Sequence, residues 1–161
     1  MKIFLSVGTQ LPFDRLVCAV DRIYSDADHF EVFGQIGRNY KYVPSFRYKD
    51  MMAPEDFYKE LTLCDVFITH CGMGNIISAL DMSKNIIVVP RDHRLGEHRN
   101  SHQFDTARWL ESWPSVSVCW DANDLDERYI LDVLANDDGV RNEEKPSLER
   151  LVAFLSDVIN F

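Results

Sequence analysis

Three features that are scarce or missing in this sequence each exclude a class of protein. Its four cysteines are scattered without a C-x-x-C pair, which argues against a structural zinc site and a disulfide framework. Lysine and arginine number 17 against 26 acidic residues, and the net charge of -9 argues against nucleic-acid binding, which needs a broad basic face. No apolar run approaches the ~18 residues of a membrane span. We expect a cytoplasmic protein with reduced thiols and no nucleic-acid partner.

Two phosphate-binding signatures are also missing. The sequence holds neither a G-x-G-x-x-G fingerprint nor the lysine of a Walker loop. Their absence argues against a dehydrogenase and against a P-loop nucleotide hydrolase. What the sequence does hold is 46% hydrophobic residues in 161 positions, enough for one sizeable core. We expect a single domain over residues 1–161, which is short for a complete enzyme with two substrates.

Short apolar runs alternate with segments of helical period along the chain. Strands are predicted at residues 3–7, 30–36, 41–46, 66–69, 86–89 and 116–120. Helices are predicted from Pro12, from Pro54, over the segment that ends at Asp81, and at residues 125–134 and 146–159. This order indicates an α/β fold, a Rossmann-like and mostly parallel sheet with helices on both faces. Such a sheet binds ligands at the carboxyl ends of its strands.

The stretch most informative about function is residues 66–103. Its first strand ends at His70, and Gly72 and Gly74 make a turn that leads into a helix. Backbone N–H groups converge at such a turn, where the partial positive charge of the helix N-terminus favours an anion. We therefore expect His70 and the N–H groups of the turn to hold a diphosphate. The alternative is a histidine that caps a helix or bonds a loop carbonyl.

A polar loop at residues 91–103 follows the next strand. Guanidinium groups bind phosphate or carboxylate through two hydrogen bonds, while Glu, Asn and Gln side chains suit the hydroxyl groups of a sugar. One alternative is a solvated loop without function. Another is a metal site at His93, His98 and His102, although no cysteine or carboxylate pair completes it. The candidate ligand-binding residues in this loop are Arg91, Arg94, Glu97, His98, Arg99, Asn100, His102 and Gln103.

Cys71 offers a different chemistry, because a thiol at a strand-to-helix turn has its pKa lowered by the helix N-terminus. It would then be the nucleophile of a hydrolase, with His70 or His98 as the base. Thr69 stands where a nucleophile elbow needs glycine, and no third orienting group is evident. Inert packing is the more common role of a buried cysteine.

Three ordered motifs carry a resemblance that covers nearly the full length of the chain. The segment FITHCG at residues 67–72 looks like the start of the UDP-sugar signature of family 1 glycosyltransferases. The whole chain more closely resembles the C-terminal domain of family 28 glycosyltransferases. Within that family it is similar to the small PssE-type catalytic subunits of bacterial exopolysaccharide and capsule transferases, and to the eukaryotic catalytic subunit that adds the second N-acetylglucosamine to a dolichol-linked chain. The motifs are VGTQLPFDRL at residues 7–16, HCGMGNII at 70–77, and VPR at 89–91 followed by GEHRN at 96–100 and HQ at 102–103.

The resemblance implies the donor-binding half of a GT-B enzyme. It implies a UDP-sugar as donor substrate, no metal or other cofactor, and a polyprenyl-linked sugar as acceptor. It also implies a membrane-anchored glycosyltransferase subunit that binds the acceptor and recruits this chain to the inner face of the membrane. The reaction would be inverting transfer of the sugar to an acceptor hydroxyl.

The resemblance also assigns roles to residues. Uracil is expected near the backbone of residues 46–48. Arg91, Glu97 and Asn100 fall in the loop that closes over the donor, and Ser78 stands where many relatives carry a ribose-binding glutamate. The donor diphosphate and sugar are assigned to Gly8, Thr9, Gln10, His70, Gly72, Met73, Gly74, Asn75, His102 and Gln103.

The general base is the part of the mechanism that the sequence leaves open. His70 is expected to stabilise the departing diphosphate, and Asp14 is the candidate base within the chain. Asp14 is equally explained as an acidic residue in the first turn of a helix, and the partner is the alternative source of the base. Glucuronic acid, galactose, glucose and N-acetylglucosamine all remain open as the donor sugar. A non-catalytic subunit that binds a nucleotide sugar or acts as a scaffold is the second hypothesis for the whole chain, and a cysteine hydrolase is the third.

Overall fold

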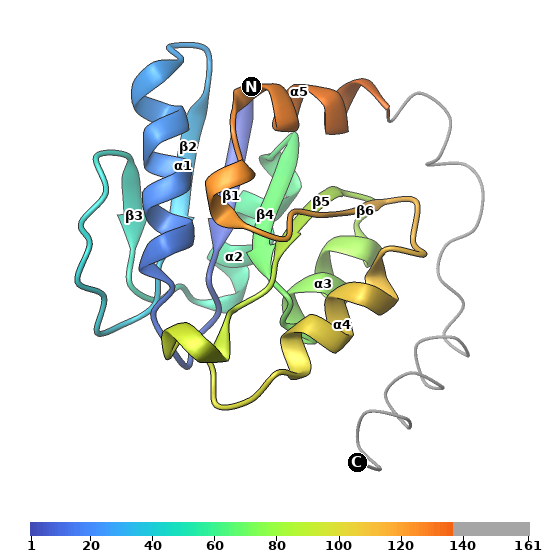
Figure 1. The fold of residues 1–161 in the computed structure, drawn as a ribbon. Coiled ribbons are helices and arrows are strands. Elements are labelled where there is room, and N and C mark those ends of the chain that lie inside the picture. The colour runs from blue at the N-terminus through green and yellow to red at the C-terminus, as the bar shows by residue number, and fades with distance from the viewer. Residues whose placement is uncertain (137–161) are drawn as a thin grey trace.

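The computed structural model describes residues 1–136, whose six strands form one parallel sheet (Figure 1). The order across the sheet is β3-β2-β1-β4-β5-β6, and every neighbouring pair is parallel. The predicted α/β class and the parallel sheet are therefore confirmed. The strands are β1 (Lys2–Ser6), β2 (Glu31–Gln35), β3 (Arg47–Lys49), β4 (Val66–His70), β5 (Asn85–Val89) and β6 (Val116–Val118).

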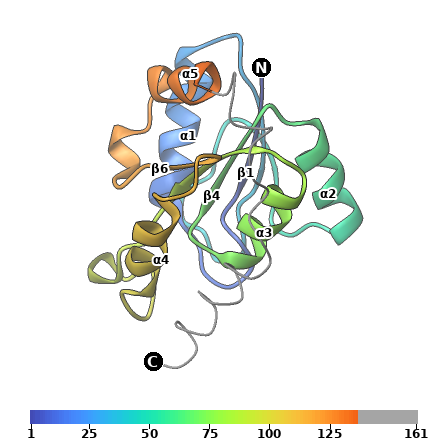
Figure 2. The same ribbon diagram turned by 90° about the vertical axis from the view of Figure 1, so that its right-hand side faces the viewer.

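Helices cover both faces of this sheet. Figure 2 shows α1 and α5 on one side and α2 and α3 on the other, and the buried side chains of α4 join the core on the side of α2 and α3. Two short 3₁₀ turns, η1 (His93–Leu95) and η2 (Ala122–Asp124), lie in the connections. The helices are α1 (Asp14–Asp26), α2 (Pro54–Leu63), α3 (Met73–Asp81), α4 (His102–Leu110) and α5 (Glu127–Ala135).

The central strands are apolar throughout because each of their faces meets helices. Along β1, Ile3 and Leu5 point into the core beside α1, while Phe4 between them points into the core beside α2 and α3. All three are at most 2% exposed. A parallel strand buried on both faces gives a continuous apolar run instead of an alternating one. The sequence pattern at residues 3–7 follows from this burial.

The chain leaves the centre of the sheet in two directions. From β1 it continues outward through β2 and β3, and it then returns to β4 on the other side of β1 before it continues outward through β5 and β6. The direction of winding therefore reverses between β1 and β4. In open parallel sheets a crevice for ligands lies at the carboxyl ends of the strands at such a reversal. The loops after β1 and β4 form this crevice.

The strand predicted at residues 41–46 is wrong, because β3 begins only at Arg47. The buried carboxylate of Asp21 on α1 holds this segment instead. Its Oδ2 accepts a hydrogen bond from the Tyr42 hydroxyl, with the two oxygens 2.6 Å apart. Its Oδ1 accepts hydrogen bonds from the backbone N–H and the hydroxyl of Ser45, each with a donor–acceptor distance of 2.8 Å. The backbone around Pro44 is therefore tied to a helix and not to a neighbouring strand.

The second correction concerns residues 102–110, which were not predicted as a helix. In the structure His102 begins α4. Its buried residues Gln103, Thr106, Ala107 and Leu110 keep a helical spacing, but two of the four are polar and obscure the apolar stripe. The first helix begins at Asp14 and not at Pro12, because Phe13 at its N-cap has φ -140°. The helix predicted at residues 146–159 lies outside the described residues.

Candidate functional site

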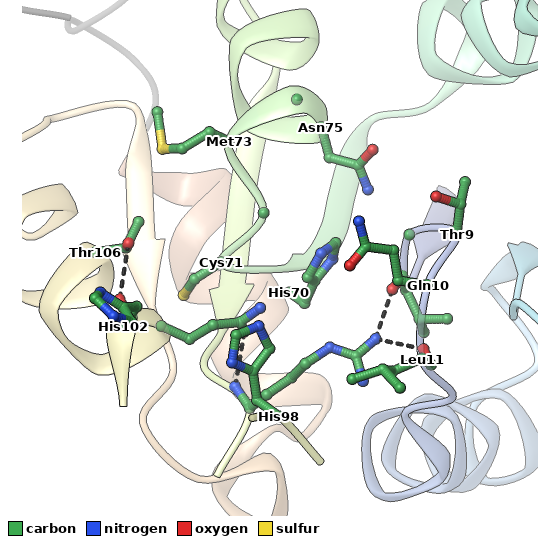
Figure 3. A pocket seen from close by; sticks show the side chains of 16 residues that line it. Thr9, Gln10, Leu11, His70, Cys71, Met73, Asn75, His98, His102 and Thr106 are labelled. Carbon is green, nitrogen blue, oxygen red and sulfur yellow. Dashed lines mark hydrogen bonds between the residues drawn. The ribbon is translucent and has the colours of Figure 1, made fainter. Parts of the chain in front are cut away.

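Three loops meet in a pocket of about 460 Å³ at the carboxyl end of the sheet. They follow β1, β4 and β5, and Figure 3 shows their side chains around one common space. Ten of the predicted substrate-site residues line it, namely Gly8, Thr9, Gln10, Gly72, Met73, Gly74, Asn75, Arg91, His102 and Gln103, together with His70. The convergence expected from a parallel sheet thus brings together residues up to 95 positions apart, since Gly8 and Gln103 share one pocket.

The imidazole ring of His70 fills the space that two glycine side chains would need. A Cβ placed on Gly8 would lie 2.6 Å from Cε1 of the ring, and a Cβ placed on Gly72 would collide with Nε2. Gly8 also has φ +80°, which L-residues rarely adopt. Gly74 differs, because a Cβ there would meet nothing within 4 Å. Gly8 and Gly72 therefore make room for His70, whereas Gly74 leaves the pocket itself open.

A chain of hydrogen bonds fixes the back of the His70 ring. The Thr69 hydroxyl donates to the Ser6 carbonyl at 2.7 Å, and this buried carbonyl can only accept. Thr69 Oγ1 is therefore an acceptor for its remaining partners, which are the Asn75 amide at 2.9 Å and Nδ1 of His70 at 3.3 Å. Nδ1 consequently carries the hydrogen, as the network assigns it. Nε2 is left as a bare acceptor.

The electrostatic surroundings agree with a neutral ring. Burial, together with the positive charge of Arg91, lowers the pKa of His70 to about 3. At neutral pH the side chain then has no charge, and its N–H group points away from Nε2. The predicted contact of His70 with a diphosphate needs a hydrogen that this form does not present at Nε2.

Backbone N–H groups at the start of α3 supply donors to the same pocket. The first bond of this helix runs from the Ile76 N–H to the Gly72 carbonyl at 3.2 Å. The N–H groups of Met73, Gly74 and Asn75 precede it, and helix geometry gives such groups no intrahelical acceptor. All three residues line the pocket. This is the geometry that favours an anion.

Arg91 lines the pocket, but its guanidinium group is committed to the protein backbone. The residue is 2% exposed. Its Nη2 donates to the carbonyls of Val7 and Leu11, each at 2.7 Å, and its Nη1 donates to those of Pro12 and Glu97. Burial lowers its pKa to about 10, so it stays charged at neutral pH. Arg91 therefore fixes the loop after β1, and the predicted two-point contact with a phosphate has no free N–H pair in this arrangement.

Four of the predicted site residues lie outside the pocket, each with a protein partner. Glu97 pairs with Arg15, with Oε1 2.9 Å from Nε. Ser78 lies on the exposed side of α3, 3.3 Å from the Tyr58 hydroxyl. Asn100 Oδ1 lies 3.0 Å from Nδ1 of His98. Asp14 accepts the Lys41 N–H at 3.0 Å. Asp14 therefore does not line this pocket, and its role as the base stays a prediction.

The pocket also includes residues that the sequence left out or assigned to other chemistry. Thr106 was missed because α4 was missed, and its hydroxyl donates to the His102 carbonyl at 2.9 Å. Cys71 is 4% exposed, and burial raises the pKa of its thiol, which disfavours the thiolate that a nucleophile needs. Among residues 1–136 no three His, Cys, Asp or Glu side chains gather as a metal ion requires, so His93, His98 and His102 do not form the alternative metal site. Val7 and Leu11 complete the wall.

The fold that places this pocket at the reversal of the sheet order is shared with solved structures. The fold is that of one half of a GT-B glycosyltransferase. The glycosyltransferase SnogD from Streptomyces nogalater is 20% identical, has a TM-score of 0.61, and is matched over 98% of this chain and 43% of its own. MurG of Acinetobacter baumannii is 16% identical, with a TM-score of 0.61 over 94% of this chain and 48% of its own.

One known protein is similar to this chain in sequence. The UDP-N-acetylglucosamine transferase subunit ALG13 of Mus musculus is 29% identical over 126 residues. The match covers 72% of this chain and 10% of that protein, so the chain spans about a tenth of the length of its relative. This confirms the resemblance found in the motifs, and the chain is glycosyltransferase-like. No protein-family model matches it. Within residues 1–136, the longest helices fall short of the length and hydrophobicity that crossing a membrane takes.

Proposed function

We propose that this chain is the donor-binding catalytic subunit of a glycosyltransferase that uses a UDP-sugar. The observation that carries the proposal is the meeting of the α3 N-terminus with the loops after β1 and β5 in one pocket. The diphosphate of the donor would lie against the N–H groups of Met73, Gly74 and Asn75. Thr9 and Gln10, from the loop after β1, line the same pocket (Figure 3) and would also bound the donor. His102 and Gln103 would face the sugar.

The chemistry of sugar transfer fits this arrangement. When the bond between the sugar and the diphosphate breaks, negative charge grows on the departing phosphate. Backbone N–H groups that already point at this position stabilise the charge without reorganisation. The donors at the start of α3 would supply this stabilisation without a metal ion. Inverting transfer also needs a base on the opposite side of the sugar.

We propose that a second subunit supplies the acceptor site and this base. The support is the similarity to ALG13, which is itself described as a subunit of a UDP-N-acetylglucosamine transferase. Asp14 lies outside the pocket, where its Oδ2 accepts the Lys41 N–H. In line with the motifs, the partner would be membrane-anchored and would present a polyprenyl-linked sugar for exopolysaccharide or capsule synthesis.

The proposed activity is tested by co-expressing the chain with its membrane partner and measuring release of UDP. We expect release from the complex, and a loss of about a hundredfold or more in His70→Ala if the complex still assembles. Tyr58→Phe is the matched control, since it removes a hydroxyl of α2 that lies outside the pocket. Unchanged release in His70→Ala would remove His70 from the mechanism. Donor binding without release from the complex would favour the alternative of a non-catalytic subunit.

The donor sugar is tested separately with a thermal-shift panel of UDP-glucose, UDP-galactose, UDP-N-acetylglucosamine and UDP-glucuronic acid. An arginine-rich loop would suit glucuronic acid, because guanidinium groups bind carboxylates. Arg91 is committed to carbonyl groups and Arg94 to Asp92, with Nη2 2.7 Å from Oδ2. We therefore expect an uncharged donor to give the largest shift. A clear preference for UDP-glucuronic acid would contradict this expectation.

A further inference from the structure

The state of His70 conflicts with the ligand proposed for its pocket. Its Nδ1 hydrogen faces Thr69 Oγ1 at 3.3 Å, so Nε2 offers only a lone pair. Nε2 lies beside Gly72, the residue that precedes α3. The oxygens of the diphosphate in a UDP-sugar carry no hydrogen at neutral pH. A phosphate oxygen at this position would therefore set one lone pair against another.

We infer that His70 takes up one proton at Nε2 when the diphosphate of a UDP-sugar enters the pocket. The proton comes from the solvent, and no covalent bond of the sugar changes in this step. The ring then donates a charge-assisted hydrogen bond to a phosphate oxygen, and such bonds are roughly twice as strong as neutral ones. This inference rests on the proposed function, because it requires a diphosphate as the ligand.

The groups that face His70 explain why the proton arrives only with the ligand. Arg91, from the segment after β5, and His98, from the loop beyond it, both act against a positive charge on the ring. The pocket also receives His102 from α4 and the buried Cys71 thiol from the turn after β4. None of the residues that line this pocket in the described structure is Asp or Glu. The empty pocket thus offers no negative charge to hold a protonated ring.

A bound diphosphate reverses this balance. It brings two negative charges, and an opposite charge within about 4–6 Å favours the charged form of a titratable group. The closed back of the ring keeps Nδ1–H in place, so protonation at Nε2 does not disturb the bonds to Thr69 and Asn75. At the moment of transfer the protonated ring would face the phosphate on which charge develops. His70 would then stabilise the leaving group as a cation.

The coupling sets the direction of the pH dependence of binding. Between the pKa of the free ring, about 3, and the raised pKa of the complex, donor affinity falls by up to about tenfold per pH unit, because binding takes up a proton that becomes scarcer as the pH rises. Above the raised pKa no proton is taken up and the affinity levels off. This pH dependence of donor affinity requires the imidazole of His70. His70→Gln keeps an amide of similar reach that does not titrate, so its affinity is flat over the same range.

The experiment is isothermal titration calorimetry of the full chain with each UDP-sugar of the panel, near pH ~7, in buffers of different ionisation enthalpy. UDP-sugars are used because their diphosphate, unlike that of UDP, does not itself titrate near neutral pH. We expect uptake of close to one proton per bound donor in the wild type and in His93→Gln, whose side chain lies outside the pocket, and none in His70→Gln. Binding without proton uptake, or uptake that persists in His70→Gln, would overturn the inference and leave the proposed function standing.

If His70→Gln fails to fold, a second measurement on the wild-type protein tests the inference. In wild-type protein with ¹⁵N-labelled histidine, the Nε2 resonance of one ring should change from the unprotonated to the protonated range when the donor is added. An unchanged resonance in a saturated complex would refute proton uptake. Absence of binding for every UDP-sugar tested would instead refute the proposed function, and the inference with it.

Discussion

Arg15 and Glu97 form a two-point ion pair across 82 residues of sequence, with Nε 2.9 Å from Oε1 and Nη2 3.0 Å from Oε2. Their side chains are 21% and 13% exposed. Pairing with Glu97 raises the pKa of Arg15. Glu97 Oε2 also accepts the Asp92 N–H at 2.8 Å. The pair thus joins the first turn of α1 to the segment after β5 and holds one wall of the pocket in place.

This geometry predicts that Glu97 acts on stability more than on donor binding. Glu97→Ala removes the two-point partner of Arg15, which keeps only Asp121 and the Pro90 carbonyl, and leaves the Asp92 N–H without its side-chain acceptor, so we expect the free energy of unfolding to fall by about 1–3 kcal/mol. Urea denaturation measures it, and a double-mutant cycle with Arg15→Ala isolates the pair. Asp105→Ala is the control, because its contact with Arg108 is 3.8 Å long and exposed. Unchanged stability with lost donor affinity would instead make Glu97 a ligand.

Alanine substitutions of the two glycines in the turn after β4 are predicted to differ in their effects on stability and donor affinity. In Gly72→Ala the new Cβ meets Nε2 of His70, so both stability and donor affinity should fall, with a cost of about 1–3 kcal/mol in stability. In Gly74→Ala the methyl group meets no protein atom, and loss of a helical glycine stabilises by up to about 1 kcal/mol. Gly74 lines the pocket, beside the space proposed for the donor.

We therefore expect Gly74→Ala to be at least as stable as the wild type but to bind UDP-sugars about tenfold more weakly. Thermal melts without ligand and calorimetric titration with donor separate the two quantities. Equal affinity in Gly74→Ala and the wild type would place the diphosphate elsewhere in the pocket.

Arg91 is predicted to tolerate no replacement, even by lysine. Lysine keeps the charge but cannot reach the carbonyls of Val7, Leu11 and Pro12 together with a planar fork. Buried carbonyls left without donors make us expect a loss of about 2–4 kcal/mol in Arg91→Lys. Arg94→Lys on the same segment is the control, and little change is expected there because the Arg94 side chain is 72% exposed. Urea denaturation compares the two, and equal stabilities would contradict the role of Arg91.

The positions of the strands and the glycine turns were predictable because they depend on local pattern. A strand buried on both faces gives a run such as residues 86–89, and a parallel sheet brings the ends of its strands to one edge. These two rules are sufficient to predict that His70 and Gly8 lie in one pocket.

The roles of Arg91 and Glu97 were not predictable in the same way. A guanidinium group beside a phosphate site is equally suited to carbonyls, and three of the four carbonyls that Arg91 binds lie 79 to 84 residues away in sequence. Asp21 similarly draws residues 42 and 45 away from strand geometry through bonds that span 21 and 24 residues. Long-range polar contacts of this kind leave no periodic trace in the sequence.

The half-buried, neutral state of His70 predicts an acid-sensitive fold. An unfolded chain binds a proton at the ordinary histidine pKa of 6.5, whereas the folded chain resists it down to about 3. Stability is therefore fully present above pH ~6.5 and is lost progressively as the pH falls toward 3. Urea midpoints measured across this window should fall less steeply in His70→Gln than in the wild type. Parallel curves for the two proteins would show that His70 titrates alike in both states.

The protected state of Cys71 yields a prediction that separates a transferase from a cysteine hydrolase. Burial raises the pKa of the thiol and leaves 4% of the residue exposed, so neither the thiolate nor a path for a reagent is available. We expect iodoacetamide to modify the partly exposed Cys18 before Cys71 in the folded protein, and all four cysteines in urea.

Cys71→Ala then removes only a buried sulfur, at a cost of about 1 kcal/mol in stability, because the cavity left is small. UDP release by the complex should stay within about twofold of the wild type, since a backbone N–H group and not the sulfur faces the phosphate in the proposed site. Mass spectrometry of the alkylated protein and the UDP-release assay provide the two readouts. A well-folded Cys71→Ala that has lost its activity would restore the nucleophile hypothesis, because no packing effect of this size abolishes turnover.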